Sequence, residues 1–205
     1  MKGIDYIGII PPQTKGKEIE AEATIEFPDI DEAMNFYEVV KERLLNVNQW
    51  HHIAGFISAK FQLTDSNGNF VNRVPHVGDL FKIDVPGPGT SEGDGYDWVV
   101  IEDIKTLNAD GREGIGIRVR PTFNPKGNKK ETAHFYNSDS TSSFMVIREN
   151  NNVRAWIVDR NITPNTEPVS LIDRLRDSVV GMSALIKFSE IQWQKLADGL
   201  IRREE

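Results

Sequence analysis

The stretch "EIEAEATIEFPDIDEAMNFYEVVKERLL", residues 18–45, decides the fold because its hydrophobic period changes from two to about 3.6 at Pro28. Over residues 18–27, apolar side chains alternate with four glutamates and a threonine, which predicts a strand with one buried and one solvent-exposed face. Asp29 followed by Glu32 is typical of a helix N-terminus. The apolar residues that recur every three or four positions predict an amphipathic helix, and they are Ile30, Met34, Tyr37, Val40 and Leu44.

The next stretch, "NVNQWHHIAG" at 46–55, predicts a second, shorter helix with Asn46 or Asn48 as its cap and Gly55 at its end. Alternating segments then predict a run of antiparallel strands at 57–64, 69–74, 79–85, 96–107, 114–121, 141–149 and 153–160. Helical spacing of apolar residues returns at about 170–203 and predicts one long final helix.

This order of elements, with helices at the ends of a run of strands, indicates an α+β fold with an antiparallel sheet. We expect a single domain over 1–205, in which residues 1–17 form an N-terminal extension. The long final helix is the element large enough to cover the apolar face of the sheet. A gap between the two is the usual place for a ligand pocket, of roughly 300 to 1,000 Å³.

The stretch "AEATIEFPDIDEAMNFYEVVKERLLNVNQWHHIAG", residues 21–55, resembles the opening of the START-like (SRPBCC) superfamily. The resemblance rests on the strand, Pro28, the helix and Trp50 near the end of the short second helix. It implies a helix-grip fold like that of Bet v 1-like proteins and polyketide cyclases. In such a fold a curved antiparallel sheet of about seven strands wraps around a long C-terminal helix, with two short helices after the first strand.

The resemblance implies a cavity beneath the last helix but no universal catalytic residue. The family includes lipid carriers, plant hormone-binding proteins, polyketide cyclases and aromatases, and chaperone co-factors. Our first hypothesis is therefore binding of a hydrophobic or amphipathic small molecule, lipid-like or polyketide-like, in that cavity. The residues that we expect to line it are Trp50, His52, Phe81, Trp98, His134, Met182 and Ile186.

Two alternatives use the same fold. In a cyclase or aromatase-type enzyme, the cavity would hold a reactive chain folded while His134 or His52 moves protons. A buried titratable residue facing the cavity would favour this alternative. In a protein-interaction module, the interior would be filled and an exposed apolar groove would replace the cavity.

The adjacent histidines His51 and His52 raise the question of a metal site. Side chains at successive helix positions point about 100° apart, so these two are poorly placed to share one ion, and no HExxH motif is present. We therefore expect no metal and no cofactor. Trp50 is interpreted as a structural residue that fills the junction between the short helices and the sheet.

Two loop motifs have simple interpretations. The glycine-rich "GPGTSEGDG" at 87–95 lacks the lysine and hydroxyl residue of a phosphate-binding loop and is expected to form a hairpin loop at the cavity rim. "DSNGNF" at 65–70 imitates the start of a calcium loop but has Phe70 where glycine is required, so a turn is expected.

Charged and aromatic strand residues leave alternatives open. Asp97 and Asp103 are expected on the same strand face as Val99 and Ile101, too far apart in sequence to indicate a paired acid–base site. Arg118 and Arg120 are expected on a solvated face, paired with acidic residues of a neighbouring strand; with the faces reversed they would bind an anionic ligand. Trp156 is expected either to stack on a ligand or to cover the edge of the sheet.

Composition excludes several classes of site. The 205 residues contain no cysteine, which rules out disulfides, zinc–thiolate sites and cysteine nucleophiles. The net charge of −7 argues against nucleic acid as a partner. A signal peptide and a membrane span are not expected from the apolar segments, so we expect a cytoplasmic protein. The tripeptide "NIT" at 161–163 matches a glycosylation sequon and is interpreted as incidental.

Overall fold

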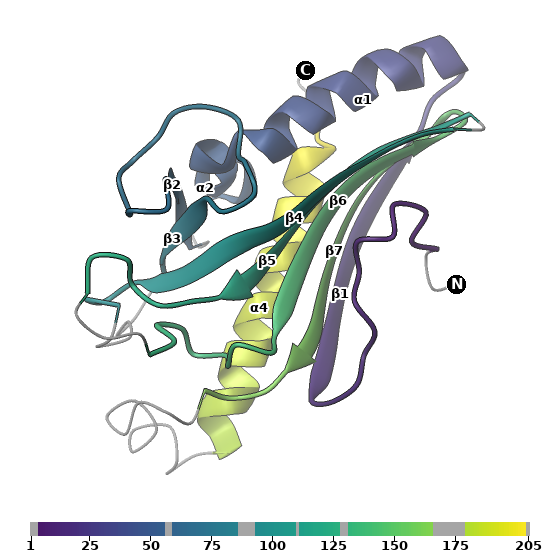
Figure 1. The fold of residues 1–205 in the computed structure, drawn as a ribbon. Coiled ribbons are helices and arrows are strands. Elements are labelled where there is room, and N and C mark those ends of the chain that lie inside the picture. Colours follow the sequence, from purple (N-terminus) through teal and green to yellow (C-terminus); the bar gives the residue numbers. More distant parts are fainter. Residues whose placement is uncertain are drawn as a thin grey trace.

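The computed structural model describes residues 4–55, 59–85, 93–109, 111–127, 131–165 and 179–203, with side chains in the last range described from Ser183 onward. Within these ranges the chain forms strands, three α-helices and a short 3-10 helix (Figure 1). The strands are β1 (Lys17–Glu26), β2 (Lys60–Thr64), β3 (Leu80–Asp84), β4 (Asp97–Ala109), β5 (Arg112–Pro121), β6 (Thr141–Glu149) and β7 (Asn152–Ile162). The helices are α1 (Ile30–Leu45), η1 (Val47–Gln49), α2 (Trp50–Ala54) and α4 (Val179–Leu200).

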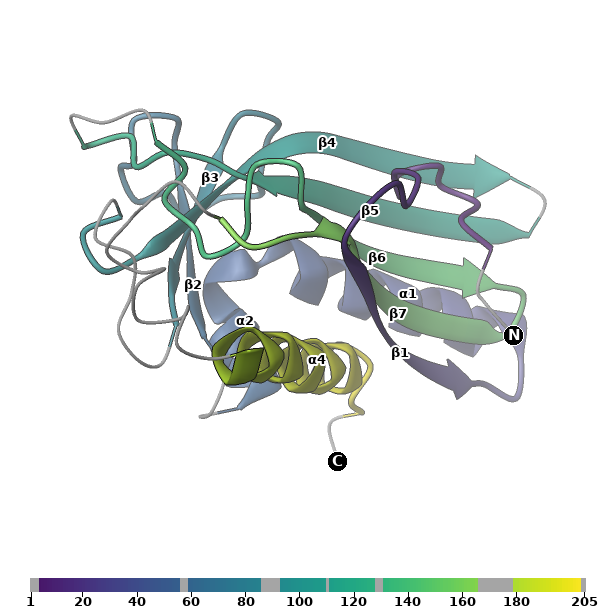
Figure 2. The same cartoon turned by 90° about the horizontal axis from the view of Figure 1, so that it is seen from below.

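The described strands form one seven-stranded sheet in the order β1-β7-β6-β5-β4-β3-β2, and all neighbours are antiparallel. Figure 2 shows α4 lying within the curve of this sheet, with α1 and α2 on the same side. The main hydrophobic core fills the space between the sheet and these helices. The predicted helix-grip architecture is therefore confirmed. The predicted start of the final helix, near residue 170, lies outside the described residues.

The first helix begins as predicted, and three of the five residues predicted for its buried stripe, Tyr37, Val40 and Leu44, are buried. Asp29 caps it, since its carboxylate accepts a hydrogen bond of 2.8 Å from the backbone N–H of Glu32. Ile30 and Met34, which were expected in the buried stripe, are 50% and 42% exposed. The buried positions are Ala33, Tyr37, Val40 and Leu44. Ala33, and not Met34, belongs to the buried stripe. The steps from Ala33 to Tyr37, Val40 and Leu44 are four, three and four residues, which keeps these side chains on one side of the helix.

The predicted cap of the second helix is wrong, because Asn46 and Asn48 make no side-chain cap at either η1 or α2. Asn48 instead joins the helices to the β2 region: its Oδ1 accepts from the Leu63 N–H at 2.7 Å and its Nδ2 donates to the Val71 carbonyl at 3.0 Å. Gly55 ends α2 as predicted, with a φ of 88° and its N–H bonded to the carbonyl of His51.

Two strand predictions need correction. Residues 69–74 do not form a strand. They contribute an isolated bridge between Thr64 and Phe70 and a 3.0 Å hydrogen bond from the Val71 N–H to the Leu63 carbonyl. Asp65 closes the preceding turn by accepting from the N–H groups of residues 67 and 69. In β4 a register shift between Ile101 and Asp103 interrupts the alternation. Asp103 therefore leaves the face of Ile101 and lies 3.7 Å from Arg118, on the opposite side of the sheet.

The arginines of β5 lie on the outer face, as the default interpretation predicted. Arg118 and Arg120 both pair with Glu102 of the neighbouring strand β4, at 3.1 and 3.2 Å. Arg118 also donates to the carbonyl of Ile9, and Arg120 donates to the carbonyl of Ser138. These arginines are therefore committed to contacts on the convex face of the sheet and do not reach the space beneath α4.

The N-terminal segment packs across this outer face (Figures 1 and 2). Ile7 and Ile9 form a second small core with residues of β6 and β7, namely Met145, Ile147, Trp156 and Val158. Gly116 permits the close approach, since a Cβ there would lie 3.0 Å from Cγ2 of Ile9. Trp156 is thereby buried beneath the chain's own N-terminal segment, which leaves it no ligand-stacking role on this face.

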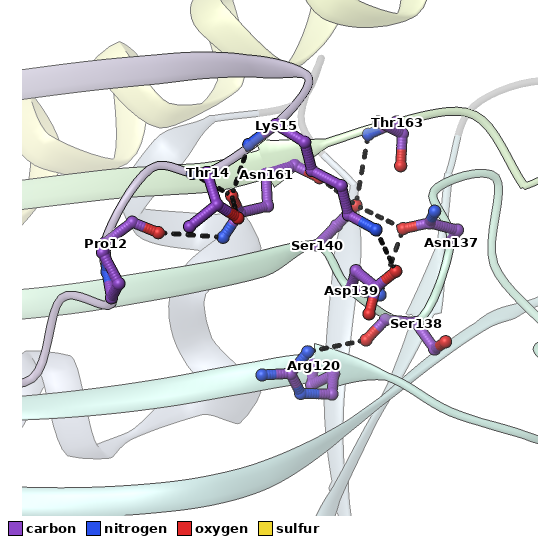
Figure 3. Close-up of polar contacts among 10 residues, drawn as sticks. All are labelled: Pro12, Thr14, Lys15, Arg120, Asn137, Ser138, Asp139, Ser140, Asn161 and Thr163. Atoms are coloured by element: carbon purple, nitrogen blue, oxygen red, sulfur yellow. Dashed lines mark hydrogen bonds and ion pairs between the residues drawn. The ribbon is translucent and has the colours of Figure 1, made fainter.

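Asn161 fastens the N-terminal segment to the end of β7 (Figure 3). Its Oδ1 accepts from the Thr14 N–H at 2.8 Å and the Lys15 N–H at 3.2 Å, and its Nδ2 donates to the Pro12 carbonyl at 3.1 Å. Lys15 adds an ion pair with Asp139. The side chain of Asn161 is thus a buried structural contact, in accord with the incidental interpretation of the sequon.

Candidate functional site: a cavity beneath α4

A small cavity lies between the concave face of the sheet and α4. Its volume is about 40 Å³. The sheet contributes residues from β2 through β7, α4 contributes its central turns, and residues 134–136 complete the wall. The described lining comprises Phe61, Phe81, Ile83, Val85, Asp97, Val99, Val119, His134, Phe135, Tyr136, Ser142, Phe144, Asp159, Phe188, Ser189, Gln192 and Trp193.

This volume is well below the expected range because aromatic side chains fill the space around it. Trp50 is fully buried and lies 4.8 Å from Phe144 and 5.6 Å from Phe81, measured between ring centroids. Trp193 of α4 packs against Phe144 at 5.2 Å. The indole N–H of Trp50 donates to the carbonyl of Leu44 at 3.1 Å, which fixes the ring between α1 and the sheet. The geometry of Trp50 is that of the predicted structural residue.

Asp159 of β7 places a carboxylate at the cavity wall. It is 2% exposed, and its Oδ2 accepts a 2.7 Å hydrogen bond from Nε1 of Trp193. Among the described residues, Oδ1 has no hydrogen-bond partner of normal geometry. Burial raises the pKa of Asp159 to about 6, although the Ser142 hydroxyl, the Trp193 indole and the charge of Arg160 act in the opposite direction. A carboxyl group with this pKa can exchange a proton near neutral pH.

His134 presents a neutral ring to the same cavity. Its Nδ1 accepts a 2.9 Å hydrogen bond from the backbone N–H of Tyr136, so the ring proton resides on Nε2. Burial lowers the pKa of His134 to about 3. An imidazole with this pKa is uncharged at neutral pH and acts there as a hydrogen-bonding group. It does not store a proton for transfer.

Tyr136 and Ser189 complete the polar part of the wall. Their hydroxyl oxygens lie 3.2 Å apart and join the segment before β6 to α4. Burial raises the pKa of Tyr136 far above its ordinary value, so the phenol stays protonated. Gln192 is also engaged, because its Oε1 accepts a 2.9 Å hydrogen bond from the Ala59 N–H. The cavity therefore has fixed polar groups within a largely aromatic wall.

The residues predicted to line the cavity separate into groups. Phe81 and His134 line the cavity, and Trp50 packs against the ring of Phe81 without lining the cavity itself. His52 is exposed on α2, where its ring lies 3.8 Å from that of His51. Trp98 is buried in a separate cluster with Leu80 and Ala133.

The last two predicted lining residues belong to α4. Ile186 is partly buried and packs against the main core. Met182 lies within the described helix, but its side chain lies outside the described residues. The predicted rim loop at 87–95 also lies mostly outside them, since only residues 93–95 are described.

The sequence prediction missed Asp159, although a signal for it exists. In β7, Ala155 and Ile157 point inward while Trp156 and Val158 point outward. A period of two places Asp159 on the inward face with Ala155 and Ile157. A charged residue at an inward strand position is uncommon and indicates a paired or functional group.

A second hollow lies on the surface beside α1 and is open to solvent. Its volume is about 480 Å³, and its walls include Phe27, Phe36, Val39, Arg43 and Arg203. The interaction-module hypothesis predicted an exposed apolar groove in place of a cavity. The wall of this hollow also includes Glu32 and Asn35, so polar and charged side chains make up much of it and it is not such a groove. Within the described ranges, no group of three or more histidine, aspartate or glutamate side chains is placed to hold a metal ion. The helices described here also include none that is long and apolar enough to cross a bilayer.

Comparison with solved structures finds matches at low identity and low TM-score. A protein from Thermus thermophilus is 13% identical, with a TM-score of 0.37 over 90% of this chain and 94% of that one. A norcoclaurine synthase point mutant from Thalictrum flavum is 9% identical, with a TM-score of 0.34 over 90% and 98%.

The di-domain ARO/CYC protein BexL, from the BE-7585A biosynthetic pathway, is 13% identical with a TM-score of 0.38, over 91% of this chain and 51% of that one. The sequence matches no protein-family model and no curated protein. The strand order and the helix inside the sheet therefore carry the conclusion that this chain has a helix-grip fold.

Proposed function

We propose that the protein binds a small, predominantly apolar molecule in the cavity beneath α4, with the buried polar groups of the wall setting its orientation. The observation that carries this proposal is a small space with aromatic walls, to whose lining the buried residue Asp159 belongs. Binding sites for small molecules usually combine apolar walls with a few fixed polar groups in this way. The free energy of binding would come from burying apolar ligand surface, at roughly 25 cal/mol per Å² before ordering costs.

The cavity volume limits the size of the ligand. About 40 Å³ holds a molecule, or part of a molecule, of only a few non-hydrogen atoms. A lipid-like or polyketide-like ligand would require α4 and the sheet to separate further around Phe188 and Trp193. Trp193 packs against Phe61 and Phe144, and its indole N–H is held by Asp159, so a larger site requires the Trp193 side chain to move and this hydrogen bond to break.

A cavity-filling variant tests this proposal. Val119→Leu adds a methylene group to the cavity wall, whereas Val100→Leu makes the same change on the outward face of the adjacent strand. Small neutral probes such as xenon and methanol should cause saturable shifts of the Trp193 indole N–H signal in the wild type and in Val100→Leu. The shifts should be much weaker in Val119→Leu. Equal shifts in all three proteins, or none in any, would contradict binding in this cavity.

Native mass spectrometry of the freshly purified protein gives an independent measurement. A co-purifying molecule that is retained by the wild type and by Val100→Leu, and lost from Val119→Leu, would support the proposal and give the mass of the ligand. Retention of the same molecule by Val119→Leu would place it elsewhere on the protein.

The carboxyl group of Asp159 favours a second candidate function, proton transfer to a bound substrate. Its raised pKa of about 6 suits a general acid or base near neutral pH, and it is better matched to that task than His134. In this alternative Asp159→Asn would retain binding of the co-purifying molecule but abolish its conversion, whereas a binding protein would show no conversion with either form.

A further inference from the structure

The lining of the cavity is acidic as well as aromatic. Two carboxylates, those of Asp97 and Asp159, belong to its wall, and the described lining includes no lysine or arginine. Granted that the cavity is a binding site, as proposed above, we propose that its ligand carries a positively charged amine, which binds Oδ1 of Asp159 and lies among the aromatic rings. The ligand class is thus a small protonated amine or the ammonium end of a larger one.

The geometry of Asp159 provides the first argument. A buried carboxylate oxygen without a hydrogen-bond partner is costly, because the group has lost its hydration without compensation. Oδ2 is satisfied by the Trp193 indole. The Ser142 hydroxyl favours the charged carboxylate, but Oδ1 makes no hydrogen bond of normal geometry within the described residues and can accept one from a ligand. An ammonium group supplies both a donor and an opposite charge to this oxygen.

The placement of the nearby arginine provides the second argument. Arg160 follows Asp159 in β7, so its side chain leaves from the opposite face of the strand. There its guanidinium pairs with Glu18 at 3.2 Å and with Glu20 at 2.7 Å. The one cation adjacent to Asp159 in sequence is therefore already neutralised by two glutamates outside the cavity.

The aromatic wall provides the third argument. Seven phenylalanine, tyrosine and tryptophan side chains line the described cavity, namely Phe61, Phe81, Phe135, Tyr136, Phe144, Phe188 and Trp193. The face of an aromatic ring carries partial negative charge and attracts ammonium groups. The same rings offer no comparable attraction to an anion, and an ionised Asp159 repels one. Charge and ring electrostatics thus select the same class of ligand.

Affinity for the amine should depend on pH through Asp159. The titratable and charged groups around it are Asp97 on β4, His134 and Tyr136 on the segment before β6, Arg160 on β7 and Glu190 on α4. His134 and Tyr136 both stay neutral between pH 5 and 7.5, because burial displaces their pKa values to either side of this interval. A change in affinity over that range therefore points to a carboxyl group of the cavity.

Methylammonium and methanol form a matched pair of probes, since they have similar size and differ in charge. Each would be titrated into the full-length ¹⁵N-labelled wild type at constant ionic strength, with the Trp193 indole N–H as the reporter. We expect methylammonium to bind about tenfold more tightly at about pH 7.5 than at about pH 5, in proportion to the ionised fraction of a carboxyl with a pKa near 6. Methanol binding should be independent of pH.

Variants assign the effect to one residue. Asp159→Asn should weaken methylammonium at least about tenfold, abolish its pH dependence and leave methanol binding intact. Asp198→Asn, an exposed change on the same helix that carries Trp193, should behave as the wild type. In Asp97→Asn the pH dependence should persist. If it disappears there and persists in Asp159→Asn, the assignment to Asp159 is wrong.

The outcomes separate this inference from the proposed function. If methanol and xenon bind and methylammonium does not, the protein binds neutral molecules and the inference fails alone. If no probe produces a saturable shift, the cavity holds water only and both proposals fail. The pH dependence in the wild type needs no variant, so the inference stays testable even if Asp159→Asn does not fold.

Discussion

Nε1 of Trp193 lies 2.7 Å from Oδ2 of Asp159, and both side chains are buried between α4 and β7. This contact joins the final helix to the sheet through a polar group in an otherwise aromatic region. It also leaves a carboxylate in the interior that must either be neutralised by a proton or be balanced by a ligand. The stability of the protein and its proposed binding of a cation therefore depend on the same residue.

Stability should fall as Asp159 ionises. Its pKa in the folded protein, about 6, lies above the ordinary value of 3.8, so the folded state holds the proton more tightly than the unfolded state. The contribution of Asp159 to the free energy of unfolding is therefore fully present below about pH 4 and is lost as the pH rises through 6. The shift in pKa corresponds to a contribution of about 3 kcal/mol. Asp159→Asn should be more stable than the wild type at pH 7 by about 1–3 kcal/mol.

Urea unfolding of the wild type and Asp159→Asn at several pH values between 4 and 7 would measure this difference. The two free energies of unfolding should approach each other as the pH falls. Parallel pH profiles of the two proteins would show that Asp159 does not carry the predicted ionisation cost.

His134 should make the protein sensitive to acid. Its pKa in the folded state, about 3, lies below the ordinary value of 6.5, so its contribution to stability is present above pH 6.5 and lost as the pH falls toward 3. Asn at position 134 offers an oxygen in place of Nδ1 to accept the Tyr136 N–H and has no such titration. His134→Asn should therefore shift the midpoint of acid unfolding to lower pH, as followed by circular dichroism. His52→Asn, at an exposed position, is the control. An unchanged midpoint in His134→Asn would show that protonation of His134 does not cause the acid sensitivity.

The fastening of the N-terminal segment should depend on both the side chain and the backbone of Asn161. This residue has a φ of 57°, which glycine adopts readily and alanine does not. Asn161→Gly should cost about 1–3 kcal/mol through lost hydrogen bonds, and Asn161→Ala about 1 kcal/mol more through strain. Denaturant unfolding of Asn161→Gly measures the cost of the lost hydrogen bonds, and the difference between Asn161→Ala and Asn161→Gly measures the cost of the backbone strain. If Asn161→Ala is no less stable than Asn161→Gly, the strain is absent.

Gly199 should be required where α4 crosses α2. A Cβ at this position would lie 2.7 Å from Cγ2 of Ile53 and would also meet the Ile53 carbonyl. Alanine favours helix by about 1 kcal/mol over glycine, yet Gly199→Ala should destabilise the protein by about 2 kcal/mol or more, because the helices must separate. Asp198→Ala, an exposed change one residue earlier, should have a small effect in the same thermal unfolding measurement. Greater stability of Gly199→Ala would mean that the helices do not approach closely at this point.

Local sequence patterns determined the elements of this fold. The alternation over 18–27 places Ile19 and Ala21 on the buried face of β1 whatever lies beyond it, because successive side chains of a strand point to opposite faces. The carboxylate of Asp29 caps α1 by bonding to an N–H three residues away, which requires no distant partner. These features depend on neighbours in the chain, so the sequence contains them in full.

Contacts between distant segments decided the rest. The register shift in β4 turned Asp103 to the outer face, and crowding among the rings of Trp50, Phe144 and Trp193 reduced the cavity to about 40 Å³. The pKa of Asp159 depends on desolvation by α4, a helix that follows β7 only after a long intervening segment. Volume and desolvation arise only when such segments pack together, and for that reason the sequence predicted a cavity beneath the last helix while the tertiary structure determined its size and charge.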